Sequence, residues 1–258
     1  PEFAELLKGC FDLDGISGQL IIVTHSTDAL IGDYRNLIRF YKDDDKTAVI
    51  SGYDLRPIEK SDNEGQIKPE DEKHLIMHFP EIKEAFYAKC AMLFEGETEY
   101  GCINAFAEKI GIALDDFGIC VINARGESSI KPLRQLLAAF SIPSVAVYDS
   151  DIKAGHTAAN DEFFTSELCF EMEIVKTLVS NGKASMVRKI ALDLDNRAES
   201  IKLDEDFIRK PFKKMGIDIS GYAPKKLSDV NESEEDEFCR MYSAWLMVKK
   251  GVLLGRIV

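Results

Sequence analysis

Short apolar runs alternate with longer amphipathic stretches in the middle of the chain. The runs are CAMLF at 90–94, ICVIN at 119–123 and SVAVY at 144–148, and helical patterns separate them at about 99–111 and 127–140. Apolar runs of this length are typical of strands that are covered on both faces, and strands that alternate with helices form parallel sheets. The pattern therefore predicts an α/β fold, in which helices flank a parallel sheet.

The pattern is purely helical after this region. We expect helices at roughly 159–166, 171–182, 183–193, 204–215 and 233–248, with Gly182, Gly216 and Gly251 as C-terminal stops. Together these helices are expected to form a C-terminal helical subdomain. Trp245 and the apolar positions around it are expected in the core of that subdomain.

The N-terminal part has a different character. Strands are predicted at 19–24 and 47–51, and residues 52–72 have the glycine, proline and charge content of a linker. A short helix is expected near 70–87. The predicted organisation therefore has four parts, at 1–60, 61–87 (linker and helix), 88–175 (sheet domain) and 176–258 (helical subdomain).

The composition is that of a globular protein. Of the 258 residues, 45% are hydrophobic and 30% are charged, which excludes a disordered chain, a collagen-like chain and a small disulfide scaffold. No apolar run approaches the ~20 residues of a membrane span. Six cysteines without a CxxC pair are expected to be reduced core thiols of a cytoplasmic protein.

The acidic charge is unevenly distributed. The formal net charge is −13. Residues 59–72 hold a net charge of −4 and residues 229–237 hold −6, so the rest of the chain carries −3. Both segments are expected to be solvated, and they leave room for a surface that faces a polyanion, because such a surface needs only local positive charge.

Acidic residues directly follow two of the three predicted central strands. Glu95 comes after the first of these strands and Glu99 follows it by one helical turn, while Asp149 and Asp151 come after the third strand. Because ligands gather at the carboxyl ends of parallel strands, we expect these four side chains to face one space. A further acidic pair, Glu171 and Glu173, opens a later helix.

So many carboxylates cannot share one cleft as unpaired anions. Two of them about 4 Å apart repel each other by roughly 4 kcal/mol at an effective dielectric constant near 20. Either some are protonated or divalent cations neutralise them, and ligation by oxygen alone favours Mg²⁺, Mn²⁺ or Ca²⁺ over zinc. The structural alternative is that each acid only caps a helix. Two doubled acidic sites on neighbouring strands favour the cation.

The arrangement around these acids resembles a TOPRIM domain. Its elements are an apolar strand before Glu95-Gly96, a glycine-containing turn at Ala124-Arg125-Gly126, and an apolar strand before Asp149-Ser150-Asp151. Primases, topoisomerases, recombination mediators and nucleases of the OLD (overcoming lysogenization defect) family share this domain. The stretch from 86 to 151 carries most of the resemblance, and its LFEGETE phrase is especially similar to the OLD family.

An upstream segment resembles a second family feature. QLIIVTHSTDAL at 19–30 is similar to the last strand and switch histidine of an ABC-type ATPase, here His25, and OLD proteins place such an ATPase directly before their TOPRIM domain. The resemblance implies that 1–60 is the C-terminal remnant of that ATPase. No GxxxxGK[ST] loop occurs, so ATP is expected to serve only the full-length protein. A homodimer through the ATPase half is a further expectation.

The resemblance also implies roles for single residues. Glu95, Glu99, Asp149 and Asp151 match metal-ligand positions of OLD nucleases, and three of them, Glu95, Asp149 and Asp151, are the expected catalytic acids. The later acidic motif of the family matches Glu171 and Glu173, which are expected to complete a second metal site. A lysine that assists catalysis matches either Lys249 or Lys250, and both remain candidates.

The implied function is a DNA endonuclease that uses two Mg²⁺ or Mn²⁺ ions, with the lysine stabilising the phosphate. The expected partner is DNA, with no membrane partner. Candidate phosphate contacts are three basic clusters, namely Lys131 with Arg134, Arg209-Lys210 with Lys213-Lys214, and Lys225-Lys226.

One alternative is a degenerate TOPRIM module that acts in assembly or DNA binding without catalysis. Another is a primase-like or topoisomerase-like enzyme, which lacks support from a catalytic tyrosine context or a zinc-binding cysteine pattern.

Overall fold

The structure, a computed structural model, describes most of the chain in two compact units. The described residues are 33–55, 82–156 and 159–258, together with Val23, Ser26, Thr27, Glu72, Leu75, Ile76, Phe79 and Pro80. The first unit comprises residues 1–91, 118–120 and 131–144, and the second comprises 92–117, 121–130 and 145–258. Most of the expected strand at 19–24, its histidine and most of the linker lie outside the described residues. The four-part organisation stays a prediction.

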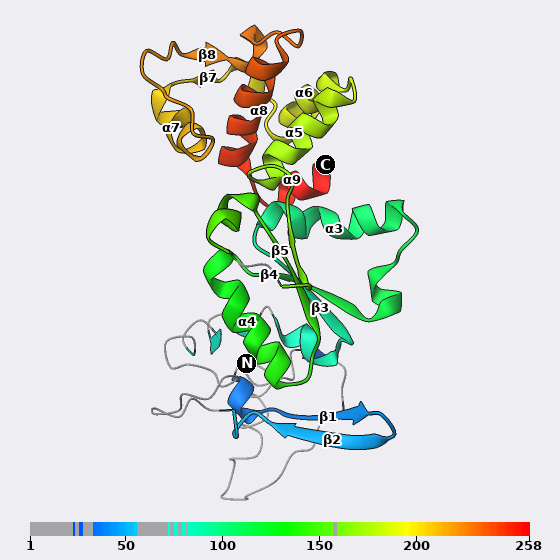
Figure 1. Cartoon of the computed structure of the whole chain (residues 1–258). Coiled ribbons are helices and arrows are strands. Elements are labelled where there is room, and N and C mark those ends of the chain that lie inside the picture. The colour runs from blue at the N-terminus through cyan, green and yellow to red at the C-terminus, as the bar shows by residue number, and fades with distance from the viewer. Residues whose placement is uncertain are drawn as a thin grey trace, which may run out of the picture. The chain divides into compact units, whose positions relative to one another are not determined.

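A four-stranded parallel sheet confirms the predicted α/β fold. The strands β3 (Cys90–Phe94), β4 (Ile119–Asn123) and β5 (Ser144–Tyr148) coincide with the three predicted runs. The order across the sheet is β4-β3-β5-β6, and β6 (Glu162–Phe164) pairs in parallel with β5. Figure 1 labels the three longer strands of this sheet.

Helices follow the strands as the pattern predicted. Between the strands lie α3 (Glu97–Lys109) and α4 (Glu127–Ala139), and after the sheet come α5 (Phe170–Ser180), α6 (Ala184–Leu194), α7 (Glu205–Lys214), α8 (Glu235–Lys249) and α9 (Val252–Ile257). Gly182 and Gly216 follow α5 and α7 with φ values of 68° and 69°, the left-handed conformation of a helix stop. Among the described residues, no helix combines the length and the apolar character that crossing a bilayer requires.

One predicted helix is wrong. Residues 159–166 form β6 and its flanking turns, because the backbone of this segment pairs with the open edge of β5, where Ala146 faces Glu162. Long-range pairing overrides local propensity in such a short strand. The sequence patterns also missed the pair of two-residue strands β7 (Lys202–Leu203) and β8 (Lys225–Lys226) and the short 3-10 helices Tyr34–Asn36, Leu114–Phe117, Ser150–Gly155, Ala198–Ser200 and Leu227–Asp229. The 3-10 helix Lys83–Tyr87 lies within the helix expected near 70–87.

The first unit contains an antiparallel hairpin. The predicted strand at 47–51 is confirmed as β2 (Lys46–Ser51), and its partner is β1 (Ile38–Asp43), which the pattern did not indicate. Arg39 of β1 donates hydrogen bonds to the carbonyl oxygens of Phe140 and Ser141. These bonds attach the hairpin to the C-terminal end of α4.

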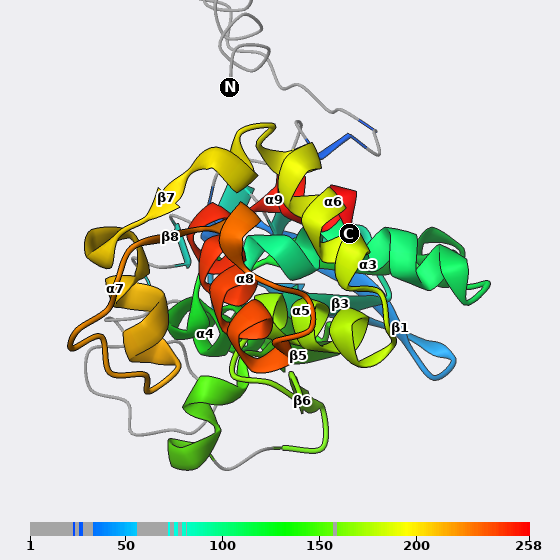
Figure 2. The same cartoon turned by 90° about the horizontal axis from the view of Figure 1, so that it is seen from above.

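The core of the second unit lies around α8, which packs against both α5 and α7. Phe238, Tyr242 and Trp245 of α8 are completely buried among apolar side chains of the neighbouring helices, which confirms the expectation for Trp245. Seen from above in Figure 2, α8 lies with α5 on one side and α7 on the other. The helical subdomain therefore has its own hydrophobic core.

Helices α3 and α9 approach each other through two glycines. A Cβ atom on Gly255 would lie 2.2 Å from the carbonyl oxygen of Thr98, and one on Gly101 would lie 2.6 Å from the carbonyl oxygen of Val252. Figure 1 shows the short α9 lying against α3. Because only hydrogen atoms occupy these two places, the C-terminal helix can approach the backbone of the helix that follows Glu95.

This close approach predicts a stability effect. Gly101→Val or Gly255→Val is expected to lower the free energy of unfolding by about 2 kcal/mol, because the added carbons force α9 away from α3. Urea unfolding measures the change. Gly155→Ala is the control, since a Cβ at Gly155 would meet no atom within 4 Å. Equal midpoints for Gly255→Val and the wild type would contradict the close contact.

Candidate functional site

Three of the predicted acids meet where two neighbouring strands end. β3 leads into Glu95 and β5 leads into Asp149, and the Glu95 N–H donates to the carbonyl oxygen of Val147 over 3.2 Å. The carboxylate of Glu95 accepts a hydrogen bond of 3.2 Å from the backbone N–H of Asp149. Asp151 follows in the first turn after β5, close enough for its charge to raise the pKa of Glu95. All of these residues belong to the second unit.

A lysine ammonium joins two of these carboxylates. Lys214 Nζ lies 3.0 Å from Asp149 Oδ2 and 2.9 Å from Asp151 Oδ2. Lys214 is the last residue of α7, whose first turn is capped by the Asp204 side chain. Burial alone would lower the pKa of Lys214, but the hydrogen bond to Asp151 and the charge of Asp149 outweigh it and raise the pKa. The ammonium is therefore held in its charged form.

Asp149 is the most enclosed of these three acids, with only 7% of its surface exposed. Its second carboxylate oxygen, Oδ1, accepts a 3.2 Å hydrogen bond from the N–H of Phe170, the first residue of α5. The positive end of the helix dipole of α5 thus faces the carboxylate. Each carboxylate oxygen of Asp149 thus has a hydrogen-bonding partner, a lysine on one and a helix N-terminus on the other.

Glu99 is buried in the first turn of α3, with 6% of its surface exposed. Burial, with a smaller contribution from the charges of Glu171, Asp149 and Glu95, raises the pKa of Glu99 to about 8, while a hydrogen bond from its own N–H acts in the opposite direction. A Cβ on Gly96 would lie 2.3 Å from Glu99 Oε2. The carboxyl group of Glu99 therefore lies directly against Gly96, where a Cβ atom would displace it.

Burial also raises the pKa of Glu95. The charges of Asp149 and Asp151 act in the same direction, whereas the hydrogen bond from Asp149 and the charge of Lys214 oppose them. Glu95 is thus less well compensated than Asp149, because Lys214 forms no ion pair with it among the described contacts.

Thr98 links the fifth acid to the C-terminus of the chain. Its hydroxyl donates a 2.9 Å hydrogen bond to Glu171 Oε1 and accepts one of 3.2 Å from the N–H of Gly251. Glu171 is 4% exposed, so this hydroxyl provides a partner for a carboxylate that water hardly reaches. The same threonine therefore connects the first turns of α3 and α5 with the start of α9.

The remaining predicted site residues have other partners. Glu173 accepts hydrogen bonds of 2.9 and 2.8 Å from the N–H and hydroxyl of Ser166. Lys249 Nζ lies 3.3 Å from Asp195, and Lys250 is exposed at the end of α8. The structure thus brings Glu95, Glu99, Asp149, Asp151 and Glu171 into one interacting cluster, which we call the acidic cluster. Glu173 and Lys249 have other partners, and Lys250 is exposed.

The basic clusters named as phosphate contacts also differ from one another. Arg209 is paired with Glu205 and Asp206, and Lys225 with Glu237. Lys210 and Lys213 of α7 are exposed. The surface of α7 next to Lys214 therefore offers free ammonium groups, within the part of the chain that the structure describes.

The donor atoms of the acidic cluster fit a hard divalent cation. All are carboxylate oxygens, and burial, together with the negative charge of the neighbouring acids, raises the pKa of Glu99 and of Glu95. Within the described residues, however, no three acidic, histidine or cysteine side chains converge closely enough to enclose a metal ion as they stand. Lys214 supplies the positive charge in this arrangement.

Sequence reasoning missed the role of Lys214 in the site and that of Thr98. Lys214 was visible only as part of a basic cluster, and 65 positions separate it from Asp149. Lys214 ends an amphipathic helix, directly before Met215-Gly216. Nothing in that local sequence indicates an ion pair with Asp149 or Asp151. Thr98 lies inside the LFEGETE phrase, where a buried hydroxyl between two helix termini can be suspected only once both helices are placed.

Comparison with known proteins adds the family. Residues 86–151 match the family described as the TOPRIM domain of proteins like the overcoming lysogenization defect protein. This segment is an OLD-like TOPRIM domain. The prediction from the sequence is thereby confirmed for the segment on which it rested. No curated protein matches the chain.

Solved structures of two OLD proteins are similar to the chain. The C-terminal region of the Xanthomonas campestris pv. campestris OLD protein is 16% identical, with a TM-score of 0.35 over 67% of this chain and 92% of that one. The C-terminal region of the Burkholderia pseudomallei OLD protein is 17% identical, with a TM-score of 0.34 over 66% and 88%.

The family match gives the TOPRIM domain a general function. It is a nuclease-type module that acts on nucleic acid, and TOPRIM domains in general bind divalent metal ions. The acidic cluster surrounds the carboxyl ends of its strands β3 and β5, where such a domain is expected to present its ligands.

The ion pairs of Lys214 with Asp149 and Asp151 predict competition with a cation. Lys214→Met is expected to tighten Mn²⁺ binding about tenfold, because the ammonium no longer occupies Asp149 and Asp151. The same variant is expected to unfold at a lower temperature in EDTA, since two carboxylates lose their counter-charge. Isothermal titration calorimetry and thermal unfolding measure the two effects. Lys210→Met, an exposed change on the same helix, is the control, and equal Mn²⁺ affinities for both variants would contradict the competition.

The pKa of Glu99 predicts a dependence of stability on pH. Because its folded-state value of about 8 lies above the ordinary 4.5, the folded chain binds more protons than the unfolded chain between these values. The free energy of unfolding must therefore fall as the pH rises from 4.5 to 8. Glu99→Gln is expected to reduce this fall by about 1–3 kcal/mol, measured by urea unfolding in EDTA. The exposed Glu108→Gln should leave it unchanged, and a fall that persists undiminished in Glu99→Gln would refute the assignment.

Proposed function

We propose that the chain is the nuclease part of an OLD-type ATP-dependent protein and hydrolyses DNA phosphodiester bonds with divalent metal ions. The observation that carries the proposal is the meeting of Glu95, Asp149 and Asp151 at adjacent strand ends of an OLD-like TOPRIM domain. Glu95 follows β3 and the two aspartates follow β5, and Lys214 forms ion pairs with both aspartates. Such a cluster is costly to a fold unless it serves to bind cations.

The chain's own residues have distinct tasks in this mechanism. Glu95, Asp149 and Asp151 would hold Mg²⁺ or Mn²⁺, with Glu99, Glu171 and Glu173 as further ligands. Two such ions, when bound, stabilise the attacking and leaving oxygens of an in-line displacement at phosphorus. Gly96 leaves room for Glu99, and Thr98 holds Glu171 in place.

A lysine would stabilise the negative charge that develops on the phosphate. The resemblance to the OLD family favours Lys249 or Lys250. The geometry supports Lys214 as a third candidate, because its ammonium already lies within 3.0 Å of two of the acids. Exposed Lys210 and Lys213 on the same helix would contact the DNA backbone beside it. ATP use and dimerisation belong, in this proposal, to the ATPase half of the full-length protein.

A non-catalytic TOPRIM module is the second candidate. Two observations favour it, namely that Lys214 occupies the place of a cation on Asp149 and Asp151, and that no three described ligands enclose a metal as they stand. In that case the ion pair would be permanent, and the domain would act only in assembly or DNA binding.

Plasmid nicking separates the two candidates. In Mg²⁺ or Mn²⁺ the chain is expected to convert supercoiled plasmid to open circles, and Glu95→Ala or Asp151→Ala should slow this reaction at least about 100-fold by removing a metal ligand. Glu108→Ala, an exposed acid on α3, is the matched control. Nicking that survives in both Glu95→Ala and Asp151→Ala would refute the proposed site.

The same assay assigns the lysine. Lys214→Met, Lys249→Met and Lys250→Met are compared at saturating metal, so that altered metal affinity does not enter. Replacement of the lysine that stabilises the phosphate should lower the nicking rate about 100-fold or more. Unchanged rates in all three variants would exclude these three lysines from this role.

A further inference from the structure

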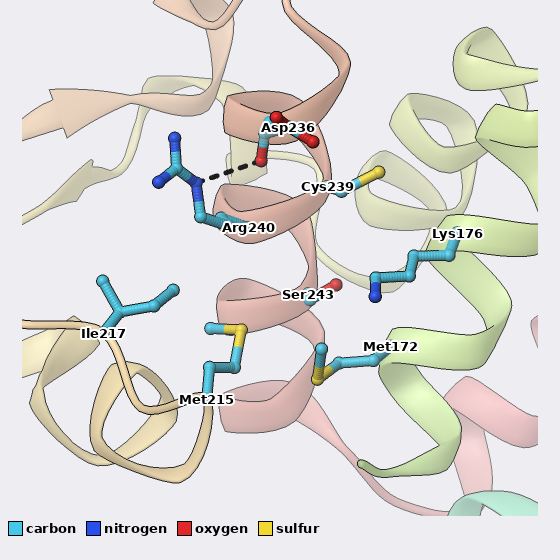
Figure 3. A pocket seen from close by; sticks show the side chains of 8 residues that line it. All are labelled: Met172, Lys176, Met215, Ile217, Asp236, Cys239, Arg240 and Ser243. Atoms are coloured by element: carbon cyan, nitrogen blue, oxygen red, sulfur yellow. Dashed lines mark hydrogen bonds between the residues drawn. The ribbon is translucent and has the colours of Figure 1, made fainter. Parts of the chain in front are cut away.

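A cavity of about 270 Å³ lies on the face of α8 that is turned toward α5 and the segment after α7. Figure 3 shows Ser243 of α8 at its centre, with Met215 and Ile217 on one side and Met172 and Lys176 on the other. The two thioethers and the isoleucine form an apolar lining. A cavity of this size is smaller than the roughly 300–1,000 Å³ of sites for drug-sized ligands, so it fits a single small ring system.

Ser243 gives the cavity an unpartnered polar group. Its side-chain oxygen is buried and has no hydrogen-bond partner among the described residues, and the residue as a whole is 1% exposed. A serine inside a helix usually bonds back to the carbonyl four residues earlier when it is buried. A buried hydroxyl left without a partner costs stability, and a ligand with a donor or acceptor on its edge would supply that partner.

The rim of the cavity carries charges of both signs, because Asp236 lines it together with Lys176 and Arg240. Lys176 reaches it from α5 while paired with Glu167 over 2.6 Å. Arg240 bonds through Nε to the carbonyl oxygen of Asp236 over 3.1 Å, and its guanidinium forms no ion pair with the described residues. An apolar interior, a hydrogen-bonding group at its base and a cation at its edge match a nucleobase that carries a phosphate beside it.

The cavity adjoins the acidic cluster along the chain. Met215 directly follows Lys214, whose ammonium contacts Asp149 and Asp151. Met172 lies between Glu171 and Glu173 on α5. We propose that this cavity binds one unstacked base of the DNA strand whose phosphate reaches the acidic cluster. The proposal rests on the proposed nuclease function and adds to it a base-binding subsite.

A neighbouring groove indicates where the strand cannot run. It shares Lys176, Asp236 and Cys239 with the cavity, and three further acids border it beside small polar and apolar residues. These acids are Glu167, Glu173 and Glu235. They repel a polyanion, so the strand is expected to leave the cavity along α7, where Lys210 and Lys213 are exposed.

Binding of single-stranded oligonucleotides tests the proposal. A fluorescein-labelled 12-mer is titrated with the chain in Ca²⁺, and a gel confirms that the strand stays intact. The same strand is then tested with one base removed, position by position. Removal of the base that enters the cavity should weaken binding of the strand about tenfold, because the contacts between that base and the cavity are lost while the phosphate contacts remain. Equal affinities for the intact strand and every abasic strand would overturn the proposal.

Two variants tie the effect to the cavity. Ser243→Ala should weaken binding of the intact strand about fivefold and leave the abasic strand unaffected, and it should fold normally because no existing hydrogen bond is lost. Ser228→Ala, an exposed serine bonded to Asp229, should change neither. Met215→Glu places a negative charge at the cavity and should abolish the preference for the intact strand. Identical behaviour of Ser243→Ala and Ser228→Ala would contradict the assignment.

The two proposals fail separately. Base preference without plasmid nicking would refute only the nuclease activity and leave the subsite in place. Plasmid nicking with equal affinity for intact and abasic strands would refute only the subsite.

Discussion

The concentration of negative charge at the ends of β3 and β5 is the constraint on which the second unit depends. Two carboxylates about 4 Å apart repel each other by roughly 4 kcal/mol even at an effective dielectric constant near 20. The fold offsets this repulsion with groups from distant segments, namely the ammonium of Lys214, the N–H at the start of α5 and the hydroxyl of Thr98. The packing of α7 and α5 against α8 can therefore be understood as the means that brings positive and hydrogen-bonding groups to the strand ends.

The C-terminal helix contributes to the same balance. Gly101 and Gly255 let α9 approach α3, and the N–H of Gly251 then reaches the hydroxyl of Thr98. That bond leaves the hydrogen of the hydroxyl free to be donated to Glu171. A packing detail between two helices thus fixes the direction of a hydrogen bond inside the acidic cluster. The side chain of Thr98 thus links the packing of α9 on α3 to the charges at the ends of β3 and β5.

The sequence predicted the sheet well and the charge partners poorly, for a physical reason. β3, β4 and β5 are covered on both faces, so each is an unbroken apolar run whose limits can be read directly. β6 has three residues and owes its existence to the edge of β5, and the run at 38–43 lacks the continuous apolar pattern. The acids at Glu95 and Asp149 could be located because they follow the strands, whereas Lys214 depends on how α7 packs. Local pattern fixes elements, but it carries little information on contacts between elements.

Glu99 distinguishes between a cluster that binds cations and one that only stabilises the fold. Lys214 could be the permanent partner of Asp149 and Asp151, and an ion pair of that kind needs no metal. Glu99 has no such partner: among the described residues its carboxylate accepts a bond only from its own N–H, and burial raises its pKa to about 8. A structural role would be filled as well by glutamine, which has nearly the same shape and no charge to bury. An ionisable side chain that is kept although it lowers stability is typical of a functional site. The buried carboxyl group of Glu99 therefore favours a cluster that binds a cation over one that is only a permanent ion pair.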